Sequence, residues 1–100
     1  MAMMEKGRAI HSPLFTIRIL DQKTAKATKV AAVAPQKVAK TAVKRNNTRR
    51  KIYQAIERLV PSLKKGFFIG IFAKSPALTA ETAKIGDDLK DLFVKAKVLS

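Results

Sequence analysis

Alternating apolar and polar residues predict β-strands in the first third of the chain. Between residues 13 and 20, Phe15, Ile17 and Ile19 fall on every second position, so they share one face of a strand. Residues 6–10 predict a brief strand ahead of this one. The first third of the chain therefore begins a β-sheet.

Two more strands are predicted nearer the middle of the chain. Residues 29–34 predict a short strand that follows a polar loop over residues 21–28. The unbroken apolar run Phe67–Ala73 predicts a strand covered on both faces, because a strand with one solvated face would alternate. Pro76 prevents this strand from continuing.

The pattern changes to a helical period over residues 40–60. The helix is predicted to end at Val60, because the residue before a proline such as Pro61 avoids the helical region. The apolar stripe of this helix, spaced i, i+3, i+4, i+7, consists of Ile52, Ala55, Ile56 and Leu59.

A second amphipathic helix closes the chain. We predict Thr79 as its N-cap, with Glu81 in the first turn, where the helix dipole favours an acidic side chain. The predicted order is β-β-α-β-α with one more short strand in front, in a single domain over residues 1–100. The apolar positions of the last helix are Ile85, Leu89, Leu92, Phe93 and Ala96.

Composition bears on function mainly through charge. The chain has 21 Lys and Arg against 7 Asp and Glu, a net charge of +14, which is typical of RNA-bound proteins rather than of enzymes with neutral substrates. The absence of cysteine excludes disulfides and thiolate metal sites. No run of 18 apolar residues predicts a membrane span, and residues 1–8 lack an apolar signal core. We therefore expect a cytoplasmic protein.

The middle of the chain carries most of the charge, with ten basic residues and one acidic residue over 37–65. Lys40 and Lys44 are four residues apart, as are Arg45 and Arg49. Each such like-charge pair costs a helix roughly 0.2–0.5 kcal/mol. The helix dipole also disfavours cations at the N-terminal end. A bound polyanion reverses the sign of these terms, so the pattern predicts contact with a nucleic-acid backbone.

A solvated helix face and a membrane surface fit these charges less well than a nucleic acid does. A solvated charged face is usual for a Lys-rich helix, but here one acid stands among eleven charges. A membrane-surface helix would need a longer apolar face, and tryptophan is absent.

The chain offers few residues for catalysis or metal binding. Asp87, Asp88 and Asp91 on the last helix could gather a cation, yet a solvated helix face accounts for them better. His11 lacks the partners of a catalytic triad. We therefore predict no catalytic residue.

Residues 37–51 are here called the basic segment. Their order resembles the RNA-binding signature of the bacterial ribonuclease P protein component. The match runs over 37–46, with its Ala-Val pair and Arg-Asn, and continues in Arg49 and Arg50. Weaker similarity extends outward over about residues 6–95. Asn47 stands where the family pattern has arginine. We expect this chain to lack the family's first helix.

The resemblance implies an α+β fold. It is a two-layer α/β sandwich of a small mixed sheet and two packed helices, in the order (β)ββαβα and without the N-terminal helix. A left-handed β-α-β crossover, an exception to the usual right-handed rule, belongs to this fold, which is shared with the second domain of ribosomal protein S5.

The resemblance also implies a function, that of the protein subunit of a ribonucleoprotein endoribonuclease that removes the 5′ leader of precursor tRNA. The RNA subunit would carry catalysis, with Mg²⁺ bound mainly by RNA, and the protein alone would be inactive. It would bind no metal, small-molecule substrate or membrane. The alternative is a non-enzymatic RNA-binding protein of ribosomal type. Contacts to the RNA subunit would come from Lys37, Lys40, Lys44, Arg45, Asn46, Arg49 and Arg50, with Asn47 a weaker contributor, and the leader cleft would include Arg8, Thr16 and Arg18.

Overall fold

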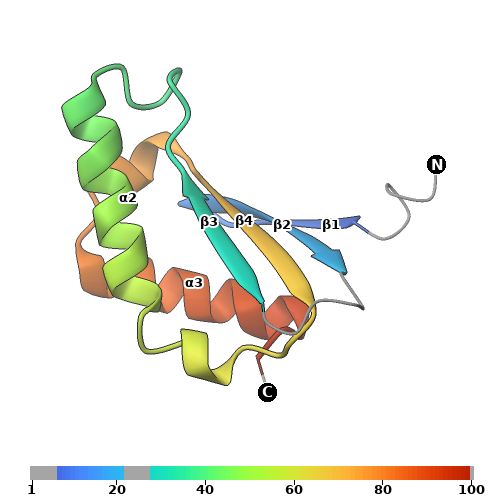
Figure 1. The fold of residues 1–100 in the computed structure, drawn as a ribbon. Coiled ribbons are helices and arrows are strands. Elements are labelled where there is room, and N and C mark those ends of the chain that lie inside the picture. The colour runs from blue at the N-terminus through green and yellow to red at the C-terminus, as the bar shows by residue number, and fades with distance from the viewer. Residues whose placement is uncertain (1–6, 22–27, 100) are drawn as a thin grey trace.

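A computed structural model describes residues 7–21 and 28–99 (Figure 1). Four strands form one mixed sheet in these residues. The strands are β1 (Gly7–His11), β2 (Phe15–Asp21), β3 (Lys29–Val33) and β4 (Phe67–Ala73).

The strand order across the sheet is β1-β2-β4-β3. β1 and β2 form an antiparallel hairpin, β2 is antiparallel to β4, and β3 is parallel to β4. A parallel pair needs a crossover connection, and α2 (Ala42–Ile56) supplies it between β3 and β4. The remaining helices are α3 (Thr82–Ala96) and the short 3₁₀ turns η1 (Val60–Ser62) and η2 (Ser75–Leu78).

Both long helices cover the same face of the sheet, α2 beside β3 and α3 across β1 and β2, as Figure 1 shows. The core lies between these two layers. This is the predicted α+β sandwich, and the predicted apolar stripes of both helices face inward. The largest fully buried side chains are Phe15, Ile17, Ile19, Ile52, Ile56, Ile69, Ile71, Ile85, Leu89, Leu92, Phe93 and Val98.

The predicted coverage of β4 on both faces was wrong. Ile69 and Ile71 are fully buried under the helices, but Phe68 and Phe72 on the opposite face are only half-buried. The run is unbroken because β4 is a central strand that carries aromatic residues on its second face. The side of the sheet that no described helix covers therefore has apolar side chains at its surface.

The predicted ends of the first helix also need correction. α2 begins at Ala42 and ends at Ile56, four residues before the predicted end. The amide of Leu59 donates to the carbonyl of Ile56 at 2.8 Å, which tightens the chain into 3₁₀ geometry. Pro61 then occupies the start of η1, where its missing N–H costs nothing.

The predicted N-cap of the last helix was wrong. Thr79 is the C-cap of η2, and its hydroxyl donates back to the carbonyl of Pro76 at 3.5 Å. α3 starts only at Thr82, with Glu81 at the N-cap and no side-chain capping bond. The reason is Pro76. Its fixed φ favours a separate 3₁₀ turn, η2, and Thr79 belongs to the end of that turn instead of to the start of α3.

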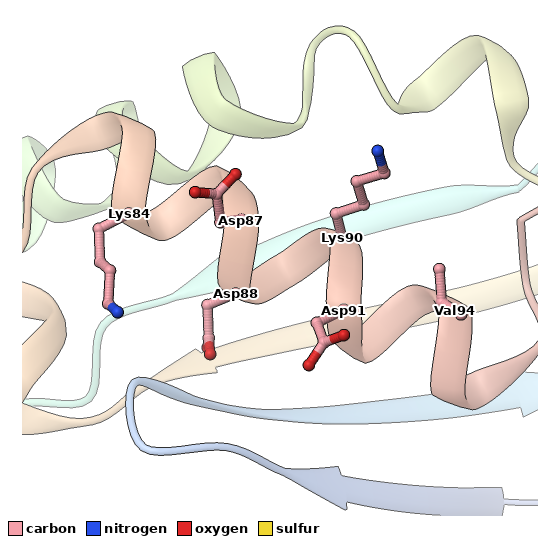
Figure 2. Close-up of a pocket in the computed structure, with 6 residues that line it drawn as sticks. All are labelled: Lys84, Asp87, Asp88, Lys90, Asp91 and Val94. Atoms are coloured by element: carbon pink, nitrogen blue, oxygen red, sulfur yellow. The ribbon is translucent and has the colours of Figure 1, made fainter.

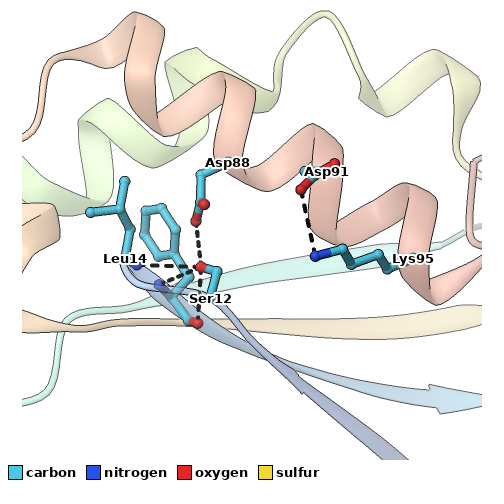
Figure 3. A network of polar contacts seen from close by, with 6 residues as sticks. Ser12, Leu14, Asp88, Asp91 and Lys95 are labelled. Carbon is cyan, nitrogen blue, oxygen red and sulfur yellow. Dashed lines mark hydrogen bonds and ion pairs between the residues drawn. The ribbon is translucent and has the colours of Figure 1, made fainter.

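A polar latch ties the β1–β2 hairpin to α3 (Figure 3). The Ser12 hydroxyl donates to a carboxylate oxygen of Asp88 and accepts from the amides of Leu14 and Phe15, at 3.3 and 3.0 Å. The ammonium group of Lys74 donates to the Ser12 carbonyl at 2.7 Å. These bonds hold the hairpin turn against the helix layer.

Some predictions lie outside the described residues. They are the contribution of Lys6 to the first strand, most of the loop predicted over residues 21–28, and the expected lack of the family's first helix ahead of Gly7. Within the described part of the chain, no helix is long and apolar enough to cross a membrane.

Candidate nucleic-acid interface

The basic segment is held in place by a turn and a helix cap. The amides of Val38 and Ala39 both donate to the Pro35 carbonyl at 2.9 Å, and Ala39 is fully buried. Thr41 then caps α2, its hydroxyl accepting from the Lys44 amide at 3.2 Å. The loop and the first turns of the helix therefore present their side chains from a fixed backbone.

Five cations at this end of the molecule are exposed, and none makes a side-chain hydrogen bond or ion pair with another described residue. No acidic residue lies in the first turn of α2. Five neighbouring positive charges leave a strong, unneutralised positive field, and Lys44 among them lies in the first turn of α2, at the positive end of the helix dipole. We call this set the docking surface: Lys37, Lys40, Lys44, Arg49 and Arg50.

Two other cations of the basic segment are already bound within the protein. The Arg45 guanidinium donates from Nη1 to the Ala39 carbonyl at 3.1 Å, bracing the loop against the helix. The Lys51 ammonium donates to the carbonyls of Leu78 and Ala80 at 3.1 and 3.0 Å. Both side chains are partly buried, so sequence-adjacent cations differ in role.

The two asparagines of the segment lie on different flanks of α2. Tyr53 lies on the β3 side of α2, because its hydroxyl accepts from the Ala32 amide at 3.1 Å. Asn46 and Arg49 precede Tyr53 by seven and four residues, so they lie on the same side of the helix. Asn47 instead lines a groove on the η2 side. Both amides are exposed.

The second candidate surface is the helix-free side of the sheet, here called the open face. Thr16 pairs with Phe72 and Arg18 pairs with Gly70 across β2 and β4, so all four positions share this face. A Cβ on Gly70 would lie 3.1 Å from the Phe72 ring, so the ring packs against the glycine. The open face thus combines a cation, a hydroxyl and aromatic surface.

The sheet register separates Arg8 from the other two residues predicted for this cleft. Arg8 pairs with Ile19, whose side chain is buried on the helix-covered side. Thr16 and Arg18 therefore share the open face without Arg8. Sequence reasoning missed Phe68 and Phe72, because an unbroken apolar run shows no alternation that would place them outside.

Comparison with known proteins identifies a family. The family model described as Ribonuclease P matches residues 1–97. The chain belongs to the ribonuclease P protein family. A ribonuclease P protein component from a Pseudanabaena species is 32% identical over 94 residues, covering 94% of this chain and 81% of the relative.

Solved structures of ribonuclease P proteins share the fold. The Staphylococcus aureus protein superposes with a TM-score of 0.83 at 21% identity, covering 98% of this chain and 88% of the other. The Thermotoga maritima protein gives 0.79 at 15% identity, covering 94% and 87%. The predicted fold is thereby confirmed. The predicted function is also confirmed: the chain is a protein subunit of ribonuclease P, a ribonucleoprotein endoribonuclease that processes tRNA.

The acidic residues of α3 do not form a metal site. Figure 2 shows Asp87 and Lys90 on one side of the helix and Asp88 and Asp91 on the other, so the carboxylates do not converge. Asp88 is bonded to Ser12, and Asp91 pairs with Lys95 at 3.6 Å (Figure 3). No group of three His, Cys, Asp or Glu suited to a metal occurs in residues 7–21 and 28–99.

Proposed function

We propose that the docking surface binds the RNA subunit of ribonuclease P through its phosphates. The observation that carries this is the group of five exposed cations without a described protein partner, which extends from the loop before α2 to the middle of that helix. Each cation that meets a phosphate releases condensed counterions, which favours binding. The backbone N–H groups of the first helical turn point the same way and add donors for phosphate oxygens.

Next to this surface, we propose that Arg45, which was predicted to contact the RNA, supports the loop. Its bond to the Ala39 carbonyl holds the loop that carries Lys37 and Lys40 against α2. Arg45 thus acts as a positioning residue, while Asn46 and Asn47 offer amide groups for base edges or 2′-hydroxyls.

The open face is suited to the single-stranded 5′ leader of precursor tRNA. Phe68 and Phe72 offer ring surface on which unpaired bases stack, and Arg18 beside them can bind a phosphate or stack on a base. Thr16 adds a hydroxyl that shares a hydrogen bond of 2.9 Å with His11. Such stacking tolerates any sequence, which suits a leader that varies among tRNA precursors.

Hydrolysis is attributed in this proposal to the RNA subunit. Asp88 is bonded to Ser12, Asp91 pairs with Lys95, and the carboxylates of α3 do not converge, which supports Mg²⁺ being held mainly by RNA phosphates. The protein lowers phosphate repulsion and holds the leader, and it acts in the cytoplasm, where tRNA precursors are processed.

Direct binding to a bacterial ribonuclease P RNA tests the docking surface. The variant Lys37→Ala/Lys40→Ala/Arg49→Ala should bind roughly 50- to 200-fold more weakly at 0.15 M salt, from three lost phosphate contacts. The matched control Lys84→Ala/Lys90→Ala/Lys95→Ala removes the same charge from α3. Equal losses in both variants would show that only net charge matters, and the proposed surface would be refuted.

A further inference from the structure

We propose that the groove between α2 and η2 binds one unpaired nucleotide, with the amide of Asn47 contacting the base. The proposal rests on the function proposed above, because it names a specific contact made when RNA docks on α2. The groove has a volume of about 500 Å³, within the usual range for small-molecule sites. It is lined by Lys44, Asn47, Thr48, Arg50, Lys51, Leu78 and Thr79.

The walls of the groove are fixed by internal bonds. Lys51 reaches across it to the carbonyls of Leu78 and Ala80, which locks η2 against the helix. The buried hydroxyl of Thr48 donates to the Lys44 carbonyl at 2.8 Å and is thereby satisfied. A nucleotide would therefore meet a preformed shape and would not need to order these elements first.

The lining matches the parts of a nucleotide. Lys44 and Arg50 are exposed at the groove and can meet phosphate oxygens, and no acidic side chain lines it among the described residues. Leu78 is half-buried and offers an apolar surface for the face of a base. Asn47 makes no side-chain hydrogen bond with another described residue, so its amide can both donate and accept.

The chemistry of Asn47 separates base binding from simple charge attraction. An arginine or lysine at this place would be drawn to any phosphate, whereas a neutral amide gains little from phosphate and pairs well with base edges. Asparagine forms two hydrogen bonds with the N6 and N7 atoms of adenine. We therefore expect adenine to bind better than other bases.

The groove and the open face serve different RNA segments. α2 packs on one side of the sheet, and the open face is the other side, so the sheet itself lies between the two surfaces (Figure 1). A nucleotide in the groove thus belongs to the RNA that docks on α2.

The experiment titrates the full chain with an RNA tetranucleotide of adenine and with the same ribose-phosphate chain lacking bases. Chemical shifts of the Asn47 side-chain amide and of the Leu78 and Thr79 backbone amides should move with the adenine oligonucleotide. The base-free chain should bind about three- to tenfold more weakly, from the loss of one or two hydrogen bonds.

Variants assign the effect to the groove. Asn47→Ala should weaken adenine binding about three- to tenfold and leave binding of the base-free chain unchanged. Gln54→Ala removes an exposed amide two turns further along α2, outside this groove, and should change neither. Equal binding of both oligonucleotides by the unmodified protein, or no effect of Asn47→Ala, would overturn the inference.

Binding to the full ribonuclease P RNA separates the two failures. If the unmodified protein binds that RNA tightly and Asn47→Ala binds equally well, the groove is not used and the docking surface stands. If the unmodified protein does not bind the RNA, the proposed function itself fails.

Discussion

Alanine substitution is predicted to affect Lys51 differently from its neighbours Arg49 and Arg50 in α2. Arg49 and Arg50 are exposed without a described protein partner, whereas Lys51 donates to the carbonyls of Leu78 and Ala80. Changing Arg49 or Arg50 to alanine should weaken binding of the RNA subunit and leave the fold intact. Changing Lys51 to alanine should instead lower the free energy of unfolding.

The magnitudes follow from the number of free charges. Five exposed cations on phosphates predict a slope of log K against log salt of about −3.5 to −4.5. Arg49→Ala or Arg50→Ala should reduce its magnitude by about 0.7–0.9 and weaken binding roughly four- to sixfold at 0.15 M salt. Lys51→Ala loses two hydrogen bonds at a partly exposed site, which costs about 1–2 kcal/mol of stability, and keeps the slope of the unmodified protein.

The assay measures binding of each variant to ribonuclease P RNA over a series of salt concentrations, with urea unfolding of the free proteins alongside. If Lys51→Ala flattened the slope as much as Arg49→Ala, the ammonium group would be meeting phosphate in the complex. The separation of free from internally bound cations would then be wrong. A lower free energy of unfolding for Arg49→Ala would also contradict this separation, because it would show that Arg49 supports the fold.

Three further predictions concern the open face and the scaffold. Phe72→Ala should weaken binding of a single-stranded leader oligonucleotide by about 1–3 kcal/mol and leave RNA-subunit affinity unchanged, and an unchanged leader affinity would refute it. Ser12→Ala leaves Asp88 without its donor and should lower the free energy of unfolding by about 1–3 kcal/mol; an unchanged urea midpoint would show the latch to be dispensable. Thr41→Ala removes the α2 cap and should cost about 1 kcal/mol by the same measurement, with an unchanged midpoint again counting against it.

Sequence patterns were enough to predict the elements whose periodicity is strong. Phe67–Ala73 is a strand with the predicted bounds, and the stripe around Ile52 and Ile56 faces the core. Element ends were less predictable, because they depend on which of two neighbouring turn signals prevails. Near α3, Pro76 starts the 3₁₀ turn η2, so Thr79 does not cap the helix, and α3 begins only at Thr82.

The roles of single cations could not be read from the sequence. The acceptors of Lys51 lie 27 and 29 residues away in the chain and are backbone carbonyls, which no side-chain pattern reveals. The placement of Arg8 needed the register of β1 against β2, since a shift of one residue would move it to the other face. The basic segment as a whole, by contrast, was visible from charge alone, because like charges at that density destabilise a helix unless a polyanion is bound.

Cleavage of precursor tRNA by a bacterial ribonuclease P RNA at low Mg²⁺ tests the central claim most directly. Adding this protein should raise the rate of 5′-leader removal, because its cations offset the phosphate repulsion that Mg²⁺ otherwise screens. The variant Lys37→Ala/Lys40→Ala/Arg49→Ala should need a much higher protein concentration for the same rate. No stimulation by the unmodified protein at any concentration would contradict the account.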